Sequence, residues 1–221
     1  MFSPKDFKSE KTIYFIRHGE SEGNVGRMYQ GPDSQLNDEG KKQAGLIAER
    51  VSKLSFETMI ASPWPRAKET AEIIGATIGK KPEFSDLFTE NTRPAVISGK
   101  LYGDKEADAI WRSWSETRYT PGKRVLDGEN FDDLIERADK ALSFLRDRKE
   151  NDIVVVTHGY FLRVIVARVL LGDLITGTTL RSFIHNTITE NTGLTVLKYQ
   201  PGFEECPAWR LWVYNDHAHL G

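Results

Sequence analysis

The sequence predicts an α/β fold: a three-layer α/β/α sandwich with a mostly parallel central sheet, one antiparallel edge strand and a lid insertion. Short apolar runs alternate with amphipathic helical stretches along most of the 221 residues, which is typical of a parallel sheet covered on both faces. The runs at residues 12–16 and 153–156 are apolar throughout, as in strands buried on both sides. Because the chain is long enough for one core and short for two, we expect a single domain over residues 1–221.

Six apolar and β-branched runs predict the strands of this sheet. They lie at residues 12–16, 58–61, 82–84, 153–156, 194–199 and 209–214. A loop that holds Pro201-Gly202 joins the last two, so we expect these two strands to form an antiparallel pair.

Apolar residues at helical spacing predict four helices. Their apolar stripes span residues 44–54, 67–78, 131–145 and 161–171. Asn37 or Asp38 is the expected N-cap of the first helix. Ser62 before Pro63 is the expected start of the second helix, with Ser62 as its N-cap, and Gly79 is its expected C-cap.

Residues from about 93 to 128 lack a clean period, so we expect a partly helical lid within the single domain rather than a second domain. This stretch carries three large aromatic side chains, Trp111, Trp114 and Tyr119. They either line an apolar pocket or pack the lid onto the core, and the sequence leaves both readings open. Arg93 and Lys100 could contact an anionic ligand, but solvated charge is the expected state of each.

The composition excludes several classes of protein. Thirty lysine and arginine residues against 32 aspartate and glutamate residues give a net charge of −2, so no nucleic-acid partner is expected. Cys206 is the single cysteine, which excludes an internal disulfide framework and a cysteine-rich zinc module. No apolar run approaches the roughly 20 residues of a membrane span, and residues 1–11 are polar and charged. We therefore expect a cytoplasmic protein with no membrane partner.

Two of the expected strands end in the same dipeptide. His18-Gly19 follows the first strand and His158-Gly159 follows the fourth. The carboxyl ends of parallel strands meet at one edge of a sheet, where ligands bind in folds of this class. A lone histidine there is more often a satisfied interior residue, but two in equivalent positions favour a functional site. A glycine after each would let the backbone turn sharply and approach a ligand closely.

Cationic side chains are expected at the same edge. Arg17 adjoins His18, and Arg66 falls in the first turn of the helix after the second strand. An arginine is always charged and can grip two oxygens of a phosphate, and a helix N-terminus adds free N–H groups. Asn24, in the loop after Gly19, could donate a further hydrogen bond. The sequence therefore predicts a small cationic pocket in a nearly neutral protein.

The sequence lacks the motifs of zinc sites, serine hydrolases and nucleotide-binding loops. No pair of zinc-binding histidines one helical turn apart occurs at either strand end, and an adjacent arginine would repel a metal ion. The Gly-x-Ser-x-Gly elbow of serine hydrolases and the Gly-rich loops of nucleotide-binding proteins are absent from the sequence. Phosphoryl transfer to a neutral histidine fits, because arginines can neutralise the oxygens of the phosphoryl group.

The motifs of the chain resemble those of the histidine phosphatase superfamily, also called the phosphoglycerate mutase-like family. The matching residues are Arg17-His18-Gly19-Glu20-Ser21 with Asn24, residues 36–40 with Gln43-Ala44, Ser62-Pro63 with Arg66, Ala67, Thr70 and Ala71, Thr157-His158-Gly159, and Asn215-Asp216 with His219-Leu220. The resemblance spans nearly the whole chain, and the combination of motifs is highly specific.

The resemblance implies a role for each candidate residue. His18 would be the nucleophile that forms a phosphohistidine, while Arg17, Arg66 and His158 would bind and stabilise the transferring phosphoryl group. Asn24 and Gly159 would assist in binding the substrate. Glu90 sits where the family places its acidic proton donor, and Asp86 is the competing acid.

The sequence after Glu90 favours a phosphatase over a mutase. In phosphoglycerate mutases, as the family is known, an Arg-His-Tyr-Gly-like segment follows the acid and the insertion carries paired arginines. Here residues 91–94 read Asn-Thr-Arg-Pro, and the insertion has no adjacent arginine pair. We therefore expect a metal-independent phosphomonoesterase that needs no cofactor and acts on a phosphorylated small molecule or a phosphopeptide. A mutase-type phosphotransferase and a catalytically weak phosphate-recognising regulatory module are the alternatives, and a homodimer is left open.

Overall fold

The computed structural model describes residues 10–201 and 207–221. Cys206 and the Gly202 of the expected final loop lie outside the described residues, as does most of the polar segment 1–11. Among the described residues, no helix is both long and apolar enough to cross a membrane.

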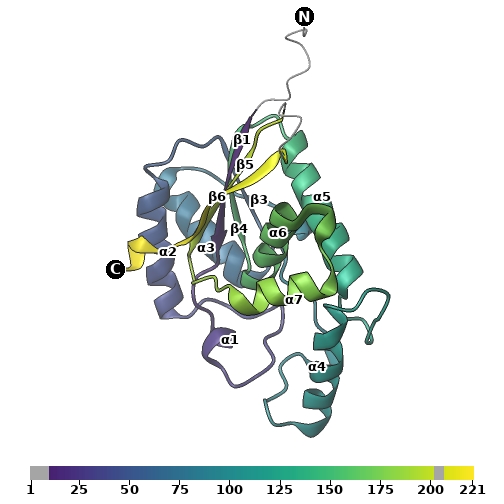
Figure 1. The fold of residues 1–221 in the computed structure, drawn as a ribbon. Helices are drawn as coiled ribbons and strands as arrows, with labels where there is room; N and C mark the ends of the chain where they lie inside the picture. The colour runs from purple at the N-terminus through teal and green to yellow at the C-terminus, as the bar shows by residue number, and fades with distance from the viewer. Residues whose placement is uncertain (1–9, 202–206) are drawn as a thin grey trace, which may run out of the picture.

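Six strands of the described chain form one sheet in the order β3-β2-β4-β1-β5-β6 (Figure 1). They are β1 (Lys11–Arg17), β2 (Thr58–Ala61), β3 (Glu83–Phe84), β4 (Asp152–Thr157), β5 (Leu194–Tyr199) and β6 (Trp209–Asp216). β1 to β4 pair in parallel, whereas β5 runs antiparallel to both β1 and β6. The mostly parallel sheet with an antiparallel side is therefore confirmed, and the reversed strand is β5, which lies beside the edge strand β6.

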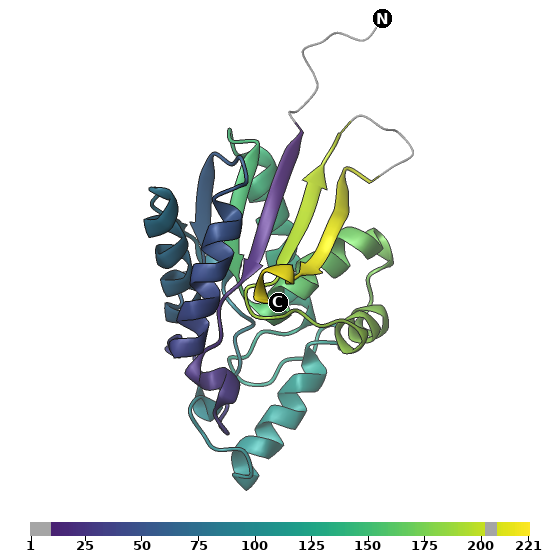
Figure 2. The ribbon, with the colours of Figure 1, turned by 90° about the vertical axis from the view of Figure 1, so that its left-hand side faces the viewer.

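Helices cover both faces of this sheet, as the three-layer prediction requires. They are α1 (Glu22–Val25), α2 (Asp38–Val51), α3 (Pro65–Ile78), α4 (Lys105–Thr117), α5 (Phe131–Asp147), α6 (Gly159–Leu171) and α7 (Gly177–Asn186). α2 and α3 pack on one face, and α5 and α6 pack on the other (Figure 2). The parallel strands β1, β2 and β4 finish at one end of the sheet, which is called the active edge.

The two central strands are buried on both faces because their side chains alternate between two apolar cores. In β1, Ile13 and Phe15 pack into the core beneath α5 and α6, and Ile16 packs into the core beneath α2 and α3. In β4, Val155 and Val156 divide between the two cores in the same way. This burial explains the uninterrupted apolar runs in the sequence and fixes the strand ends that carry the histidines.

The helix caps match the prediction at two places and differ at a third. Asn37 is the N-cap of α2 and accepts a hydrogen bond from the backbone N–H of Gly40 at 2.8 Å, and Gly79 caps α3 in the left-handed conformation. The prediction that Ser62 caps α3 is wrong, because α3 begins at Pro65 with Trp64 as its N-cap. A residue before proline is disfavoured in the helical conformation. Trp64 therefore lies outside the first turn, and Pro65 takes the N1 position.

Residues 93–128, the insertion, lie beyond the carboxyl ends of the central strands (Figures 1 and 2). The insertion contains a short 3-10 turn, Ala95–Ile97, and α4. Its two ends meet at Thr92 and Glu129: the Thr92 N–H donates to Glu129 Oε2 at 2.7 Å, and the Glu129 N–H donates to the Thr92 carbonyl at 2.8 Å. The chain thus leaves and re-enters the core at one point.

Candidate active site

The two motif histidines lie side by side at the active edge. β1 and β4 pair in parallel with Arg17 opposite Thr157, so the next residues, His18 and His158, leave the sheet together. Their ring centroids are 5.0 Å apart, and the exposed fractions of the two residues are 2% and 0%. The structure therefore brings together the pair that the strand ends predicted.

The hydrogen bonds of His18 assign its tautomer. Nδ1 lies 2.6 Å from the Gly19 carbonyl oxygen and must donate to it, and Nε2 accepts from Arg66 Nε at 3.2 Å. Burial, with the charges of Arg66 and Arg17, holds the pKa of His18 well below 6.5. His18 is thus a neutral imidazole whose Nε2 keeps its lone pair.

His158 is held by Ser62, the residue that directly follows β2. Its Nε2 lies 2.8 Å from Ser62 Oγ, and its Nδ1 has no hydrogen-bond partner among the described residues. Burial, again with the charge of Arg66, holds the pKa of His158 well below 6.5. Ser62 is a site residue that the sequence does not identify, because its position before Pro63 predicts a helix cap. Its place directly after β2 is the signal that could have assigned it to the site.

Arg66 is buried and Arg17 is half-buried, and neither has a carboxylate within ion-pair distance in the described chain. Arg66 uses Nη1 to donate to the carbonyls of Gly31 and Pro32, both at 3.3 Å, and burial lowers its pKa to about 10. Arg17 donates from Nη1 to the Thr189 carbonyl at 2.5 Å, while its buried Nε has no partner in the described residues. Buried charges are normally paired, so this arrangement fits a site that receives an anion.

The glycines after the histidines serve close packing. A Cβ on Gly19 would lie 2.4 Å from the Gly40 carbonyl oxygen, and a Cβ on Gly159 would lie 3.1 Å from Arg17 Nε. Neither glycine has a positive φ, so the sharp turn that we expected is not the reason for either. Gly159 instead leaves room for the Arg17 side chain at the start of α6.

Glu90 lies at the N-terminus of α6, the helix whose N-cap is His158. Its Oε1 accepts from the N–H groups of Asn91 and Phe161, each at 2.9 Å, and its Oε2 accepts from the Tyr160 N–H at 3.0 Å. These three N–H donors hold the Glu90 side chain in one orientation at the start of α6. Asp86, the competing acid, is exposed and lines a different hollow, beside Leu87 and Lys140.

Asn24, a predicted binding residue, does not line the cavity. It belongs to the short helix α1 and is exposed. Its Oδ1 accepts from Ser21 and from Asn191 Nδ2 at 3.4 Å, and the same Asn191 group donates to the His18 carbonyl at 3.0 Å. Asn24 is therefore linked to His18 through Asn191, and its role in binding stays a prediction.

A cavity of about 790 Å³ opens between the active edge and the insertion. Arg17, Glu90 and Gly159 form its wall on the side of the core, whereas His18 and His158 are buried and are not lining residues. Trp111 and Trp114 line the cavity from the insertion, whereas Tyr119 packs into the main core. Both readings of the three aromatic residues thus hold in part. Arg93, expected to be solvated, is half-buried in the cavity wall, while Lys100 is exposed.

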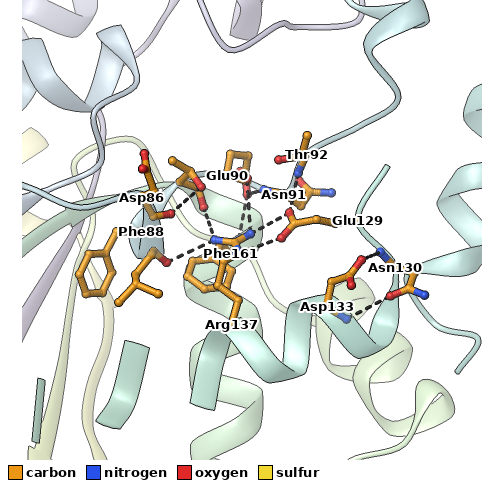
Figure 3. Close-up of polar contacts among 12 residues, drawn as sticks. Asp86, Phe88, Glu90, Asn91, Thr92, Glu129, Asn130, Asp133, Arg137 and Phe161 are labelled. Atoms are coloured by element: carbon orange, nitrogen blue, oxygen red, sulfur yellow. Dashed lines mark hydrogen bonds and ion pairs between the residues drawn. The ribbon is translucent and has the colours of Figure 1, made fainter. Parts of the chain in front are cut away.

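Arg137 on α5 holds the chain that carries Glu90 (Figure 3). Its guanidinium forms two 2.8 Å hydrogen bonds with the Glu129 carboxylate and donates to the Thr89 carbonyl at 2.8 Å. It lies 3.6 Å from the ring centroid of Phe161, which is on α6. One arginine therefore joins α5, α6, the base of the insertion and the Glu90 segment.

The low pKa values of the two motif histidines predict a pH-dependent stability. An unfolded chain protonates each histidine near pH 6.5, whereas the folded chain protonates His18 and His158 only at much lower pH. The unfolded state thus binds more protons below pH 6.5, and the free energy of unfolding should fall with acidification by up to about 1.4 kcal/mol per pH unit for each histidine.

Urea denaturation between about pH 5.5 and 7 measures this slope. We expect His158→Gln to flatten it by up to the contribution of one histidine, and His217→Gln, at an exposed position, to leave it as in the wild type. Equal slopes for the wild type and His158→Gln would show that His158 is not held neutral by the fold.

Comparison with known proteins identifies the family of the chain. The model of the histidine phosphatase superfamily (branch 1) matches residues 13–211. Phosphoglycerate mutase-like protein 4 of Arabidopsis thaliana is 32% identical over 215 residues, which cover 94% of this chain and 86% of the relative.

Two solved structures share the fold. YhfR of Bacillus stearothermophilus has a TM-score of 0.77 at 24% identity and covers 96% of this chain and 100% of its own. A mycobacterial glucosyl-3-phosphoglycerate phosphatase has a TM-score of 0.74 at 23% identity and covers 94% of this chain and 100% of its own. With the family model extending over nearly all of the sheet and both histidine motifs, the chain belongs to the histidine phosphatase superfamily.

Proposed function

We propose that this protein is a metal-independent phosphomonoesterase that works through a phosphohistidine on His18. The observation that carries the proposal is the state of His18: a neutral ring with Nδ1 bonded to the Gly19 carbonyl and Nε2 unprotonated beside Arg66. A neutral imidazole nitrogen fixed by its other nitrogen is the form in which histidine acts as a nucleophile.

The proposed reaction has two steps. Nε2 of His18 attacks phosphorus, the ester P–O bond breaks, and protonated Glu90 gives its proton to the leaving oxygen. Arg17, Arg66 and His158 hold the other phosphoryl oxygens as charge develops on them. Ionised Glu90 then takes a proton from water, which attacks phosphorus. The P–N bond breaks, inorganic phosphate leaves, and His18 is neutral again.

The size and lining of the cavity favour a phosphorylated small molecule over a phosphopeptide. A volume of about 790 Å³ lies in the range typical of small-molecule sites. Tyr29 and Trp111, which line the cavity, stack at an interplanar angle of 29° and could pack against the leaving group. A cytoplasmic location and a homodimer stay predictions.

Hydrolysis is favoured over transfer to a second hydroxyl by the sequence after Glu90. Residues 91–94 depart from the mutase pattern, and the insertion lacks the paired arginines of mutases. The names of the similar proteins include both activities, since the plant relative is called mutase-like and the mycobacterial structure is a phosphatase. A test of the function must therefore measure both phosphate release and isomerisation.

The test is a screen of phosphorylated metabolites and phosphopeptides for phosphate release, with and without EDTA, together with an assay for isomerisation of phosphoglycerates. We expect phosphate release that EDTA does not reduce. Loss of activity in EDTA would favour a metal-dependent hydrolase, and isomerisation without phosphate release would favour a mutase. Tight binding of phosphate esters without turnover would favour a regulatory module.

Arg137 gives a second prediction of this proposal. We expect Arg137→Met to lower kcat/KM for alkyl phosphates about tenfold and for p-nitrophenyl phosphate less, because a displaced Glu90 matters most where the leaving group needs a proton. The substitution also removes one partner of the Arg137–Glu129 ion pair, in which the two side chains are 14% and 17% exposed. Leaving Glu129 unpaired should lower the free energy of unfolding by about 3 kcal/mol. Steady-state kinetics and urea denaturation measure the two effects.

Arg148 provides the matched control. It pairs with Glu83 and Glu150 near the amino end of β4, away from the active edge. Arg148→Met should change stability and leave the preference between the two ester classes as in the wild type. Equal losses of kcat/KM on both classes in Arg137→Met would mean that Arg137 only stabilises the fold and does not position Glu90.

A further inference from the structure

The C-terminal motif, Asn215-Asp216 with His219, has no part in the proposed reaction, yet it is linked to the active edge. The motif begins in β6, which β5 separates from β1, and it ends beside α2 (Figure 1). Residues 189–193, the connecting segment, come directly before β5. Hydrogen bonds join this segment to the motif on one side and to the end of β1 on the other.

The connecting segment binds the chain at Arg17 and His18. The Thr192 N–H donates to the Arg17 carbonyl at 3.0 Å. Asn191 Nδ2 donates to the His18 carbonyl at 3.0 Å. The Thr189 carbonyl accepts from Arg17 Nη1 at 2.5 Å. The segment therefore orients both the peptide that carries the nucleophile and the guanidinium beside it.

Asn215 holds the connecting segment from the side of β6. Its Oδ1 accepts from the Glu190 N–H at 2.7 Å, and its own N–H donates to Thr195 Oγ1 at 3.1 Å. A Cβ on Gly193 would lie 2.3 Å from the same Oδ1, so the amide fills the space that this glycine leaves. Asn215 has a φ of 49°, in the left-handed region that few side chains adopt. Such a conformation persists where the surrounding contacts enforce it, as they do here.

His219 holds the segment through Thr192. Arg50 Nη1 can only donate, and it lies 3.5 Å from Nδ1 of His219, so Nδ1 is the acceptor. Burial, with the charge of Arg50, lowers the pKa of His219 and keeps its ring neutral. Nε2 therefore carries the proton and donates to Thr192 Oγ1 at 2.9 Å. That hydroxyl in turn donates to the Asn191 carbonyl at 2.7 Å.

Both ends of this chain of hydrogen bonds are fixed. Arg50 belongs to α2 and pairs with the Asp216 carboxylate through both Nη atoms, which lowers the pKa of Asp216 to about 2. Thr192 is fully buried and has a φ of 56°, which is unusual for a β-branched residue. The connecting segment is thus held between a helix of the core and the end of β1.

We propose that Asn215 and His219 are positioning residues, which act through the connecting segment on the nucleophile and on the arginine beside it. The role depends on the proposed phosphatase function. The Gly19 carbonyl that fixes Nδ1 of His18 follows directly after the carbonyl that the segment binds. A displaced segment would therefore turn both the imidazole that attacks phosphorus and the guanidinium that receives the developing charge. Phosphoryl transfer is sensitive to such displacements, because the reacting atoms must be close and aligned.

Two substitutions remove the contacts of the motif with the segment. Asn215→Gly removes the Oδ1 acceptor and still tolerates the left-handed backbone. His219→Leu removes the donor to Thr192. We expect each to lower kcat/KM by about 10- to 100-fold. The loss should be the same for alkyl phosphates and for p-nitrophenyl phosphate, because the nucleophile attacks both, whereas loss of the proton donor affects mainly the first.

Conservative variants and a neighbouring histidine provide the controls. Asn215→Asp keeps the acceptor and His219→Gln keeps a donor, so each should restore most of the activity. His217→Leu is the matched control for His219→Leu, because His217 is exposed and its ring bonds to the Asn215 carbonyl rather than to the segment. It should keep wild-type kinetics. Thermal unfolding of each variant checks that it is folded at the assay temperature.

Binding of vanadate and of inorganic phosphate separates positioning from stability. Vanadate takes the five-coordinate geometry of the transition state when a nucleophile approaches it, whereas inorganic phosphate stays tetrahedral. We expect Asn215→Gly and His219→Leu to weaken calorimetric binding of vanadate about tenfold or more and binding of phosphate much less. If both variants keep the wild-type ratio of the two affinities and only unfold at a lower temperature, the motif has a structural role and the proposal is wrong.

Nitrogen-15 NMR of histidine-labelled protein reads the His18 ring without turnover, and His18→Ala identifies its signals. The wild type should show the single Nδ1–H tautomer, and the Asn215→Gly/His219→Leu double variant should show a mixture or exchange broadening. If the wild type hydrolyses no ester yet this change is present, the positioning role stands and the phosphatase proposal fails. Wild-type turnover with unchanged kinetics and unchanged His18 signals in the double variant overturns the positioning role alone.

Discussion

His18→Ala should lower kcat/KM for phosphate release by at least about 10⁴-fold, because it removes the nucleophile and with it the covalent route. The variant keeps Arg17, Arg66 and His158, so it should still bind phosphate esters. We therefore expect the loss to fall on kcat and the affinity for substrate to change little. Phosphate-release assays and calorimetric binding measure these two quantities.

The matched control is His217→Ala. His217 is exposed, and the hydrogen bond that the structure gives its ring is to the Asn215 carbonyl at 2.9 Å, away from the cavity lining. This variant should retain wild-type activity. If His18→Ala hydrolyses phosphate esters at the wild-type rate, the assignment of the nucleophile is wrong, and the neutral ring of His18 has only a structural role.

Glu90→Gln should have the next largest effect, and the effect should depend on the leaving group. The amide keeps the shape of the side chain but supplies no proton. For alkyl phosphates, whose leaving oxygen needs a proton, we expect kcat/KM to fall by about 10²- to 10⁴-fold. For p-nitrophenyl phosphate, whose leaving group departs without one, the fall in the first step should be less than about tenfold.

Asp86→Asn is the control for the Glu90 assignment. Asp86 was the competing acid in the sequence, but its exposed side chain lines a hollow apart from the cavity. It should show wild-type kinetics on both classes of ester. Equal losses on alkyl and aryl phosphates in Glu90→Gln would mean that another group donates the proton, and a leaving-group-dependent loss in Asp86→Asn would identify that group.

Much of this site could be predicted because it depends on local sequence and on one topological rule. The runs at 12–16 and 153–156 read as central strands, and parallel strands end at a common edge, so His18 and His158 were expected at the same edge. The same rule predicted the position of Arg66, because the helix that carries it follows the end of β2. These predictions needed no knowledge of how distant parts of the chain pack.

The residues that the sequence did not assign depend on long-range packing. The Ser62 hydroxyl contacts His158, which is 96 residues away in the chain. Arg137 reaches the carbonyl of Thr89 across 48 residues. Trp111 and Arg118 reach the cavity only because the insertion folds back over the active edge. The helix α7 was missed because its apolar residues, Leu180, Phe183 and Ile184, are few. No local pattern in the sequence encodes such contacts.

Trapping of the covalent intermediate tests the central claim most directly. Glu90→Gln is mixed with 32P-labelled p-nitrophenyl phosphate and quenched in alkali, which preserves phosphohistidine, and the labelled peptide is mapped. We predict a burst of nitrophenol of about one per active site, and an acid-labile label on His18 that persists because Glu90 is needed to activate water. A Glu90→Gln/His18→Ala double variant should carry no label. Turnover without a label, or a label on any other residue, would contradict the mechanism.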